Sequence, residues 1–333
     1  MAKKTAAKNV TFSDQPFWIG FDLGGTKMLA CVLDENFNVL GSARKSTHGS
    51  QGPARGLKRM VVSIREAMAA ANVDPARIMG IGIGCPGTVD TEKGILITAP
   101  NLGWHRIHLG RSLERIFLCP VSILNDVDAG TFGEYRHGAA VGARSVLGVF
   151  PGTGLGAGFV YEGKLVRGKN VSCMELGNLW LPGTHLNSTK PGAVLLEDLT
   201  SRLGVASAAS VECYRGAAPQ LDAKTNASLR EMKSKALSSS YQVGEAAVSN
   251  IFNNSAHFLG MGIAIVVNLL SPDHIVLGGG LVEELPVFYL RKLREVIALY
   301  AMPEIFRGTK LSVAKLGGNS VTVGAVTWLR ENR

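Results

Sequence analysis

The sequence lacks closely spaced cysteines. Its five cysteines are spread along the chain, and the nearest two, Cys85 and Cys119, are 34 residues apart. This spacing excludes CxxC zinc and redox motifs, and an odd number fits poorly with a disulfide framework. We therefore expect reduced, mostly buried thiols in a cytoplasmic protein.

Long apolar runs and dense charge runs are missing as well. The most apolar stretch, 261–270, has about half of the ~20 residues that a membrane span needs, and Asn268 interrupts it. Lys and Arg outnumber Asp and Glu by 35 to 26, but no basic run or basic-aromatic pattern accompanies this excess. We expect no membrane and no nucleic acid among the partners.

Glycine is present in excess, with 40 copies among 333 residues, well above the usual share of about 7%. No Gly-X-Y period or Gly/Ser tract accounts for the excess, so the glycines are expected in many special turns. The length itself predicts about two domains of ~150 residues each.

Strand-like and helix-like runs alternate along the chain, which predicts an α/β fold. In the first half, strands are expected at 17–22, 27–33, 38–46, 78–84, 94–98 and 121–124, and helices at 53–70, 109–117 and from about 127. In the second half, strands are expected at 145–150, 158–161, 164–168, 274–277 and 311–314, and helices at 245–270, 284–300 and 321–330. Between them, 182–245 is expected to hold helices and loops whose order the pattern does not define.

The opening pattern of strand, glycine turn and strand occurs twice. The two turns begin at Gly24 and Gly152, which are 128 residues apart. This repetition indicates a duplicated supersecondary unit whose two copies face each other across a cleft.

The first glycine turn follows a carboxylate at a strand end, in the run Asp22-Leu23-Gly24-Gly25-Thr26-Lys27. Backbone amides in such a turn can bind phosphate oxygens, while the acid holds Mg²⁺ through water. The order Thr-Lys and the strand that follows exclude a Walker A motif. An ordinary hairpin turn is the alternative interpretation.

Three further glycine segments differ in what they predict. Residues 82–87 match GxGxxG, but no helix and no acid follow at the required distance, so a loop lining a cleft is favoured over a dinucleotide site. Residues 152–158 form a second candidate phosphate turn, in which Thr153 can donate to a phosphoryl oxygen. Residues 278–280 are three glycines, whose backbone an adenosine could approach closely because no side chain intervenes. A turn that packs a strand closely against a helix is the alternative interpretation.

An acid, Asp126, directly follows the apolar strand 121–124 and Asn125. The carboxyl ends of strands are where α/β sheets bind ligands. Alone, Asp126 would be interpreted as a helix N-cap. Because two candidate phosphate turns flank the same expected cleft, we favour a base that acts on a substrate hydroxyl.

Together, these segments resemble the ROK family of sugar kinases and sugar-responsive repressors, from about Trp18 to the C-terminus. The matching runs are FDLGGTK, GCPGTVD, PNLGW, LNDVDAGTFGE, GTGLGAG, ELG and VLGGG. The resemblance implies the α/β actin-like ATPase (ribonuclease H-like) fold, which is a duplicated two-domain fold with an interdomain cleft. It also implies a glucokinase-like homodimer that phosphorylates a hexose at a primary hydroxyl with ATP and Mg²⁺.

The resemblance also implies domain limits and site residues. The expected parts are a flexible arm at 1–16, an N-terminal domain at 17–136, a C-terminal domain at 137–315, and a final helix at about 316–333 that packs back on the first domain. Asp126 would be the catalytic base, and the sugar contacts would be Asp126, Gly87, Asn101, Asn125, Glu175 and Glu197. The cofactor contacts would be Asp22 for Mg²⁺ through water, Gly24, Gly25, Thr26, Lys27, Gly152, Thr153 and Gly154 for phosphates, and Gly278 and Gly279 near the nucleoside.

The sequence departs from the family pattern at its zinc segment. Asn178 stands where the family has a His that binds sugar and zinc, and 180–200 contains no cysteine in place of CxCGxxGCxE. His185 alone cannot make a tetrahedral site. We therefore expect no zinc site, and the lost His leaves the identity of the hexose open.

Two alternatives to an ATP-dependent kinase remain. One is a non-catalytic sugar-binding module, which Asn178 and the missing zinc segment favour. A DNA-binding repressor is disfavoured, because only sixteen residues precede the first expected strand. The other is a polyphosphate-using glucokinase of the same family, which Asp128 in the NDVDA run and the net charge of +9 favour.

Overall fold

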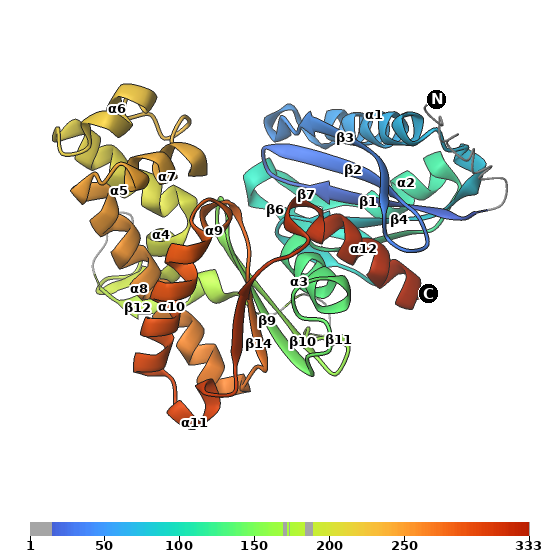
Figure 1. The fold of residues 1–333 in the computed structure, drawn as a ribbon. Helices are drawn as coiled ribbons and strands as arrows, with labels where there is room; N and C mark the ends of the chain where they lie inside the picture. Colours follow the sequence, from blue (N-terminus) through green and yellow to red (C-terminus); the bar gives the residue numbers. More distant parts are fainter. Residues whose placement is uncertain (1–14, 169–171, 173, 184–188, 333) are drawn as a thin grey trace, which may run out of the picture.

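Two five-stranded sheets form the centre of the molecule (Figure 1). This computed structural model describes residues 15–168, 172, 174–183 and 189–332. The first sheet has the order β3 (Val39–Ser46), β2 (Lys27–Leu33), β1 (Phe17–Leu23), β4 (Ile78–Cys85) and β8 (Val121–Asn125). The second has the order β11 (Lys164–Leu165), β10 (Leu155–Tyr161), β9 (Ser145–Pro151), β14 (His274–Leu277) and β15 (Lys310–Val313).

The two sheets share one topology. β1 pairs antiparallel with β2 and parallel with β4, and β9 pairs in the same way with β10 and β14. β8 and β15 then extend the two sheets by parallel pairing. The glycine turns after β1 and β9 are therefore equivalent, and the predicted duplication is confirmed.

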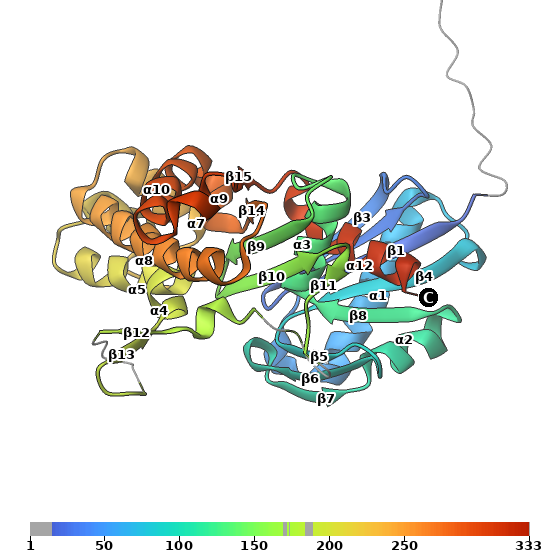
Figure 2. The same cartoon turned by 90° about the horizontal axis from the view of Figure 1, so that it is seen from below.

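Helices cover the outer faces of the sheets, and two helices lie between them (Figures 1 and 2). α1 (Pro53–Ala71) packs on β2 and β3, and α12 (Ser320–Glu331) packs on β1 and β4. α3 (Asp126–His137) packs against α12 and also against β9 and β10 of the second sheet. α3 thus touches both halves of the molecule.

The other elements lie at the periphery. Small sheets are formed by β5 (Thr88–Asp90), β6 (Ile95–Ala99) and β7 (Trp104–Ile107), and by β12 (Trp180–Pro182) and β13 (Ala193–Leu195). The remaining helices are α2 (Leu109–Phe117), α4 (Leu196–Thr200), α5 (Arg202–Tyr214), α6 (Pro219–Thr225), α7 (Ser234–Gln242), α8 (Ala246–Leu270), α9 (Gly280–Glu284), α10 (Pro286–Tyr300) and α11 (Pro303–Phe306). The helix expected at 284–300 is confirmed as α10, and the short α9 precedes it as a separate helix, because Leu285 leaves the helical conformation ahead of Pro286.

α12 approaches the first sheet closely because the facing strands carry glycines. A Cβ atom on Gly20 would lie 2.4 Å from the carbonyl oxygen of Thr322, and one on Gly82 would lie 2.3 Å from that of Ala325. Neither contact leaves room for a side chain. The last helix of the chain is therefore seated on the first sheet, although the strand before it belongs to the second.

α8, with 25 residues, is long and apolar enough to cross a membrane by length and composition. Its side chains Phe252, Leu259 and Ile263 are fully buried in the core of the second half. α8 is thus the central helix of a packed core, and its hydropathy reflects that burial.

The chain passes between the two sheets twice, and one buried carboxylate holds both passages. Glu134, on α3, accepts hydrogen bonds from the backbone N–H of Ala139 (2.8 Å), where the chain leaves α3 for β9. The N–H groups of Lys315 (2.9 Å) and Leu316 (2.8 Å) and the hydroxyl of Ser320 (2.9 Å) donate to it from the return between β15 and α12. Glu134 is therefore paired on both oxygens.

Candidate active site between the two sheets

A cavity of about 610 Å³ opens between the two sheets, at the ends of β1, β8 and β9. Fifteen of the sixteen predicted site residues line it, namely Asp22, Gly24, Gly25, Thr26, Gly87, Asn101, Asn125, Asp126, Gly152, Thr153, Gly154, Glu175, Glu197, Gly278 and Gly279. The exception is Lys27, which is exposed at the start of β2. The residues come from both halves of the chain, as the duplicated pattern predicted.

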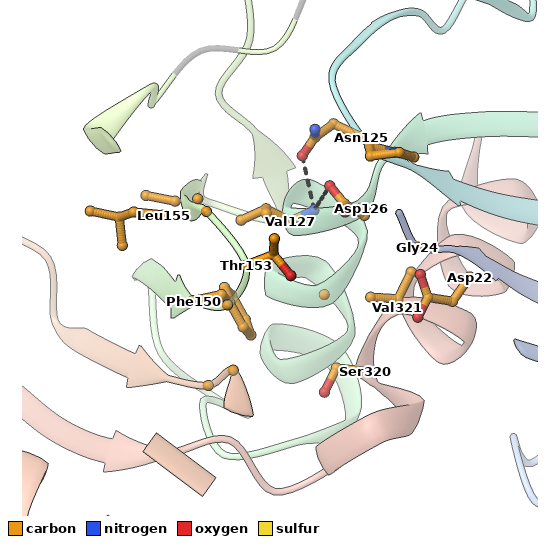
Figure 3. A pocket seen from close by; sticks show the side chains of 18 of the residues that line it. Asp22, Gly24, Asn125, Asp126, Val127, Phe150, Thr153, Leu155, Ser320 and Val321 are labelled. Atoms are coloured by element: carbon orange, nitrogen blue, oxygen red, sulfur yellow. Dashed lines mark hydrogen bonds between the residues drawn. The ribbon is translucent and has the colours of Figure 1, made fainter. Parts of the chain in front are cut away.

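Asp126 stands at the junction between β8 and α3. Asn125 is the N-cap of α3, because its Oδ1 accepts hydrogen bonds from the N–H groups of Val127 (2.9 Å) and Asp128 (3.1 Å). Asp126 also accepts from Val127 N–H, through its Oδ1 at 3.0 Å (Figure 3). The structure thus gives the principal capping role to Asn125, and Asp126 Oδ2 remains available to the cavity.

Burial raises the pKa of Asp126 to about 7, and the negative charge of Asp22 adds to this effect. Burial likewise raises the pKa of Asp22 to about 6, although the positive charge of Arg44 opposes it. A carboxylate of this kind changes protonation near neutral pH, which is the property of an effective general base.

Asn125 also fixes the loop that follows β4. Its Nδ2 donates to the carbonyl of Gly87 at 3.0 Å. Gly87 itself has a φ of +81°, and a Cβ there would lie 2.2 Å from the carbonyl oxygen of Thr98. Only glycine fits this turn. Asn125 was predicted as a sugar contact, and within the protein its amide already joins α3 to the Gly87 loop.

Two acids reach the cavity from the second half of the chain. Glu175 is exposed, and its Oε2 accepts a hydrogen bond from Nδ2 of Asn178 at 3.0 Å. Asn178, which stands where the resemblance predicts a His, thus contacts a predicted sugar-binding acid. Glu197 accepts from the N–H of Leu155 at 2.7 Å, so this second acid also holds the end of the second glycine turn.

The second glycine turn and the Gly278 segment meet at the end of β9. Gly279 has a φ of +83°, and a Cβ on it would lie 2.7 Å from the carbonyl oxygen of Pro151. A Cβ on Gly278 would collide with the ring of Phe150 at 2.5 Å. Gly278 is thus buried against the ring of Phe150, while Gly279 is partly exposed, and both line the cavity beside the second turn.

Several cavity residues escape sequence reasoning. Phe150 and Leu155 flank the second turn, and Ser320 and Val321 enter from the start of α12 (Figure 3). Phe150 is the residue before the last of β9, which is a usable signal for a position at a strand end. The α12 residues are far away in sequence, and no local pattern links them to the cavity.

Few side chains near the cavity could hold a metal ion in the part of the chain that the structure describes. Residues 15–168, 172, 174–183 and 189–332 contain no group of three His, Cys, Asp or Glu side chains arranged for a metal ion, and His185 lies outside the described residues. The carboxylates of Asp22 and Asp126 repel each other across the cavity. Such a site fits Mg²⁺, which takes one or two carboxylates and completes its shell with water and phosphate oxygens.

The comparisons with known proteins agree with this geometry. The chain is 27% identical over 318 residues to the glucokinase of Halalkalibacterium halodurans, and this match covers 94% of each chain. It is 28% identical to the xylose repressor of Caldicellulosiruptor bescii, over 79% of this chain and 65% of the repressor.

A crystal structure of a ROK family glucokinase from Streptomyces griseus, in complex with glucose and AMPPNP, superimposes with a TM-score of 0.82. The two sequences are 26% identical, and the match covers 95% of this chain and 100% of that chain. The fold is thus that of the actin-like ATPases. The model of the ROK family matches residues 18–332, so the chain belongs to the ROK family.

Proposed function

We propose that this protein is a sugar kinase that transfers the terminal phosphoryl group of ATP to a primary hydroxyl of a hexose such as glucose. The observation that carries the proposal is one cavity that combines a carboxylate of raised pKa, Asp126, with glycine turns from both halves of the chain. The similarity to glucokinases, including one bound to glucose and AMPPNP, supports this choice of substrates.

In this reaction Asp126 accepts the proton of the sugar hydroxyl as the hydroxyl oxygen forms its bond to the γ-phosphorus. The bond from the γ-phosphorus to the bridging oxygen breaks at the same time, and the products are the sugar phosphate and ADP. A positioned base contributes ~10²- to 10⁴-fold to such a step. Glu175 and Glu197 are proposed to accept hydrogen bonds from the remaining sugar hydroxyls.

The phosphates are proposed to lie on the two glycine turns, where backbone N–H groups neutralise charge that develops on the transferred group. Mg²⁺, when bound, supplies further neutralisation of the phosphate oxygens, and Asp22 is the residue proposed to hold it through water. Gly278 and Gly279 are proposed to accept the nucleoside, because both line the cavity beside the second turn.

The proposal is tested by ATP consumption with a hexose panel at fixed ATP and Mg²⁺. Turnover is expected with glucose or a close relative of it. The matched control is 6-deoxyglucose, which retains the ring hydroxyls but lacks the primary hydroxyl, so it should bind without turnover. The same panel with polyphosphate in place of ATP, at varied salt, tests the alternative donor.

A non-catalytic sugar-binding module is the second candidate, and the similarity to a xylose repressor favours it. The two candidates differ in one measurement. If calorimetry detects binding of a hexose but no hexose is phosphorylated with either donor, the kinase proposal is wrong and the module is correct.

The raised pKa of Asp126 predicts a pH dependence. As a base, Asp126 acts only when deprotonated, so kcat/KM for the hexose should rise with pH through about 7. Below that value, the rate should fall about tenfold per pH unit. The measurement is initial rate between about pH 5 and pH 8, with coupling enzymes in excess at each pH. A flat profile over this range would contradict the role of Asp126.

A further inference from the structure

Arg202, the first residue of α5, is bound to the second glycine turn in two ways. Its backbone N–H donates to the carbonyl of Gly152 at 2.9 Å. Its Nη2 donates to the hydroxyl oxygen of Thr153 at 3.2 Å. Glu197 holds the other end of the same turn through the N–H of Leu155. The α4–α5 segment thus fixes the turn from both ends.

The guanidinium of Arg202 has no acidic partner among the described residues. Its Nη1 contacts only the carbonyl of Met232, at 3.5 Å, and burial lowers its pKa with no opposing charge from an acid. By contrast, Arg136, Arg144 and Arg215 each pair with a glutamate at 2.9 Å or less. A half-buried cation without a counter-ion favours the binding of an anion next to it.

The hydroxyl of Thr153 connects this cation to the cavity. Thr153 lines the cavity, whereas Arg202 stands behind it. Because the hydroxyl oxygen accepts from Arg202, its proton is directed to another acceptor, and hydrogen bonds in such a chain strengthen one another. Gly152 N–H is already bonded to the carbonyls of Phe150 and Gly154, while the N–H groups of Thr153 and Gly154 have no partner in the described part of the chain. The turn therefore presents three donors.

We propose that Arg202 is a positioning residue for a chain of anhydride-linked phosphates, the terminal phosphates of the donor. It orients the Thr153 hydroxyl as a donor to a phosphoryl oxygen and supplies the positive charge that this anion needs. The inference rests on the proposed function, because it assigns the second turn to the donor. It adds a cation that no sequence motif indicated.

The test uses binding, so that it does not depend on turnover. The Arg202→Met variant keeps the length of the side chain and removes its charge, while Arg202→Lys keeps the charge. Arg215→Met, at the exposed end of the same helix, is the matched control. Calorimetry of the full-length protein measures Kd for AMPPNP, tripolyphosphate, adenosine and glucose with each variant.

Arg202→Met is expected to weaken AMPPNP and tripolyphosphate by about 10- to 100-fold, the value of a charge-assisted hydrogen bond. Adenosine and glucose should change by less than about twofold, and Arg202→Lys should recover part of the loss. In the double variant with Thr153→Val, the two losses should not add, because the arginine acts through the hydroxyl.

Each other outcome has a distinct meaning. Unchanged AMPPNP binding by Arg202→Met, or an equal loss for adenosine, overturns the role of Arg202 in phosphate binding while the proposed kinase stands. Failure of the unmodified protein to bind either AMPPNP or tripolyphosphate overturns the proposed function, and this inference with it. Binding of tripolyphosphate but not AMPPNP keeps Arg202 in its role and identifies polyphosphate as the donor.

Discussion

Replacing Asp126 by Asn should lower kcat for hexose phosphorylation by ~10²- to 10⁴-fold, because the amide cannot accept the proton of the attacking hydroxyl. The change retains the size of the side chain and one oxygen, which can still accept from Val127 N–H. Hexose affinity should therefore remain within about tenfold. Steady-state rates with ATP, together with calorimetry of hexose binding, measure the two effects. Turnover near that of the unmodified protein would rule out Asp126 as the base.

The thermal stability of Asp126→Asn shows whether a loss of turnover is caused by unfolding of the variant. In the folded protein the pKa of Asp126 is raised from 3.8 to about 7, so the folded state holds this proton more tightly than the unfolded state. Between about pH 4 and pH 7, its ionisation therefore lowers the free energy of unfolding as pH rises. Asn carries no charge, so Asp126→Asn should raise Tm at pH 8, and the gain should disappear near pH 4.

Replacing Glu134 by Ala should lower the free energy of unfolding by about 3–5 kcal/mol, the largest stability effect that we expect. Three backbone N–H groups and one hydroxyl donate to this carboxylate, which has no exposed surface. All four donors would lose their partner in the interior. Urea unfolding, followed by circular dichroism, measures the change.

Two further variants make this result specific. Glu134→Gln keeps the volume of the side chain but replaces one carboxylate oxygen by an NH₂ group. Whichever oxygen is replaced, the NH₂ group faces a backbone N–H donor, so this variant should also be destabilising. Glu66→Ala removes an exposed acid that pairs with Lys45, and it should change stability by less than about 1 kcal/mol. If Glu134→Ala were no more destabilising than Glu66→Ala, the proposed contribution of Glu134 to the free energy of unfolding would be wrong.

Much of the fold could be predicted from local pattern. The alternation of apolar runs and glycine turns was sufficient to identify the main strands and the repeated unit at Gly24 and Gly152. The sheet formed by β5, β6 and β7 was only partly anticipated, because its strands are three to five residues long and their burial alternates irregularly. The order of elements in 182–245 could not be predicted, because α4, α6 and α7 are short and the segment gains its stability from packing. α4, α5 and α7 pack on α8, and α6 packs on α5 and α7.

The candidate site likewise has some features that the sequence predicts and others that only the fold shows. Asp22, Asp126 and the glycine turns are visible in sequence because each lies at or directly after the end of a strand. The capping by Asn125, the contact between Asn178 and Glu175, and the bond from Arg202 to Thr153 depend on how the chain is folded. Arg202 is 49 residues from Thr153, and no spacing rule joins a helix start to a turn at that distance.

α3 has a mechanical consequence for the cavity. Asp126 is at its first residue and Glu134 is eight residues further along, so the helix rise puts about 12 Å between them. Both passages of the chain between the sheets meet at Glu134, so the joint between the two halves and the candidate base lie on one helix. Because α3 also packs on β9 and β10, the same helix sets the position of Asp126 relative to the second glycine turn.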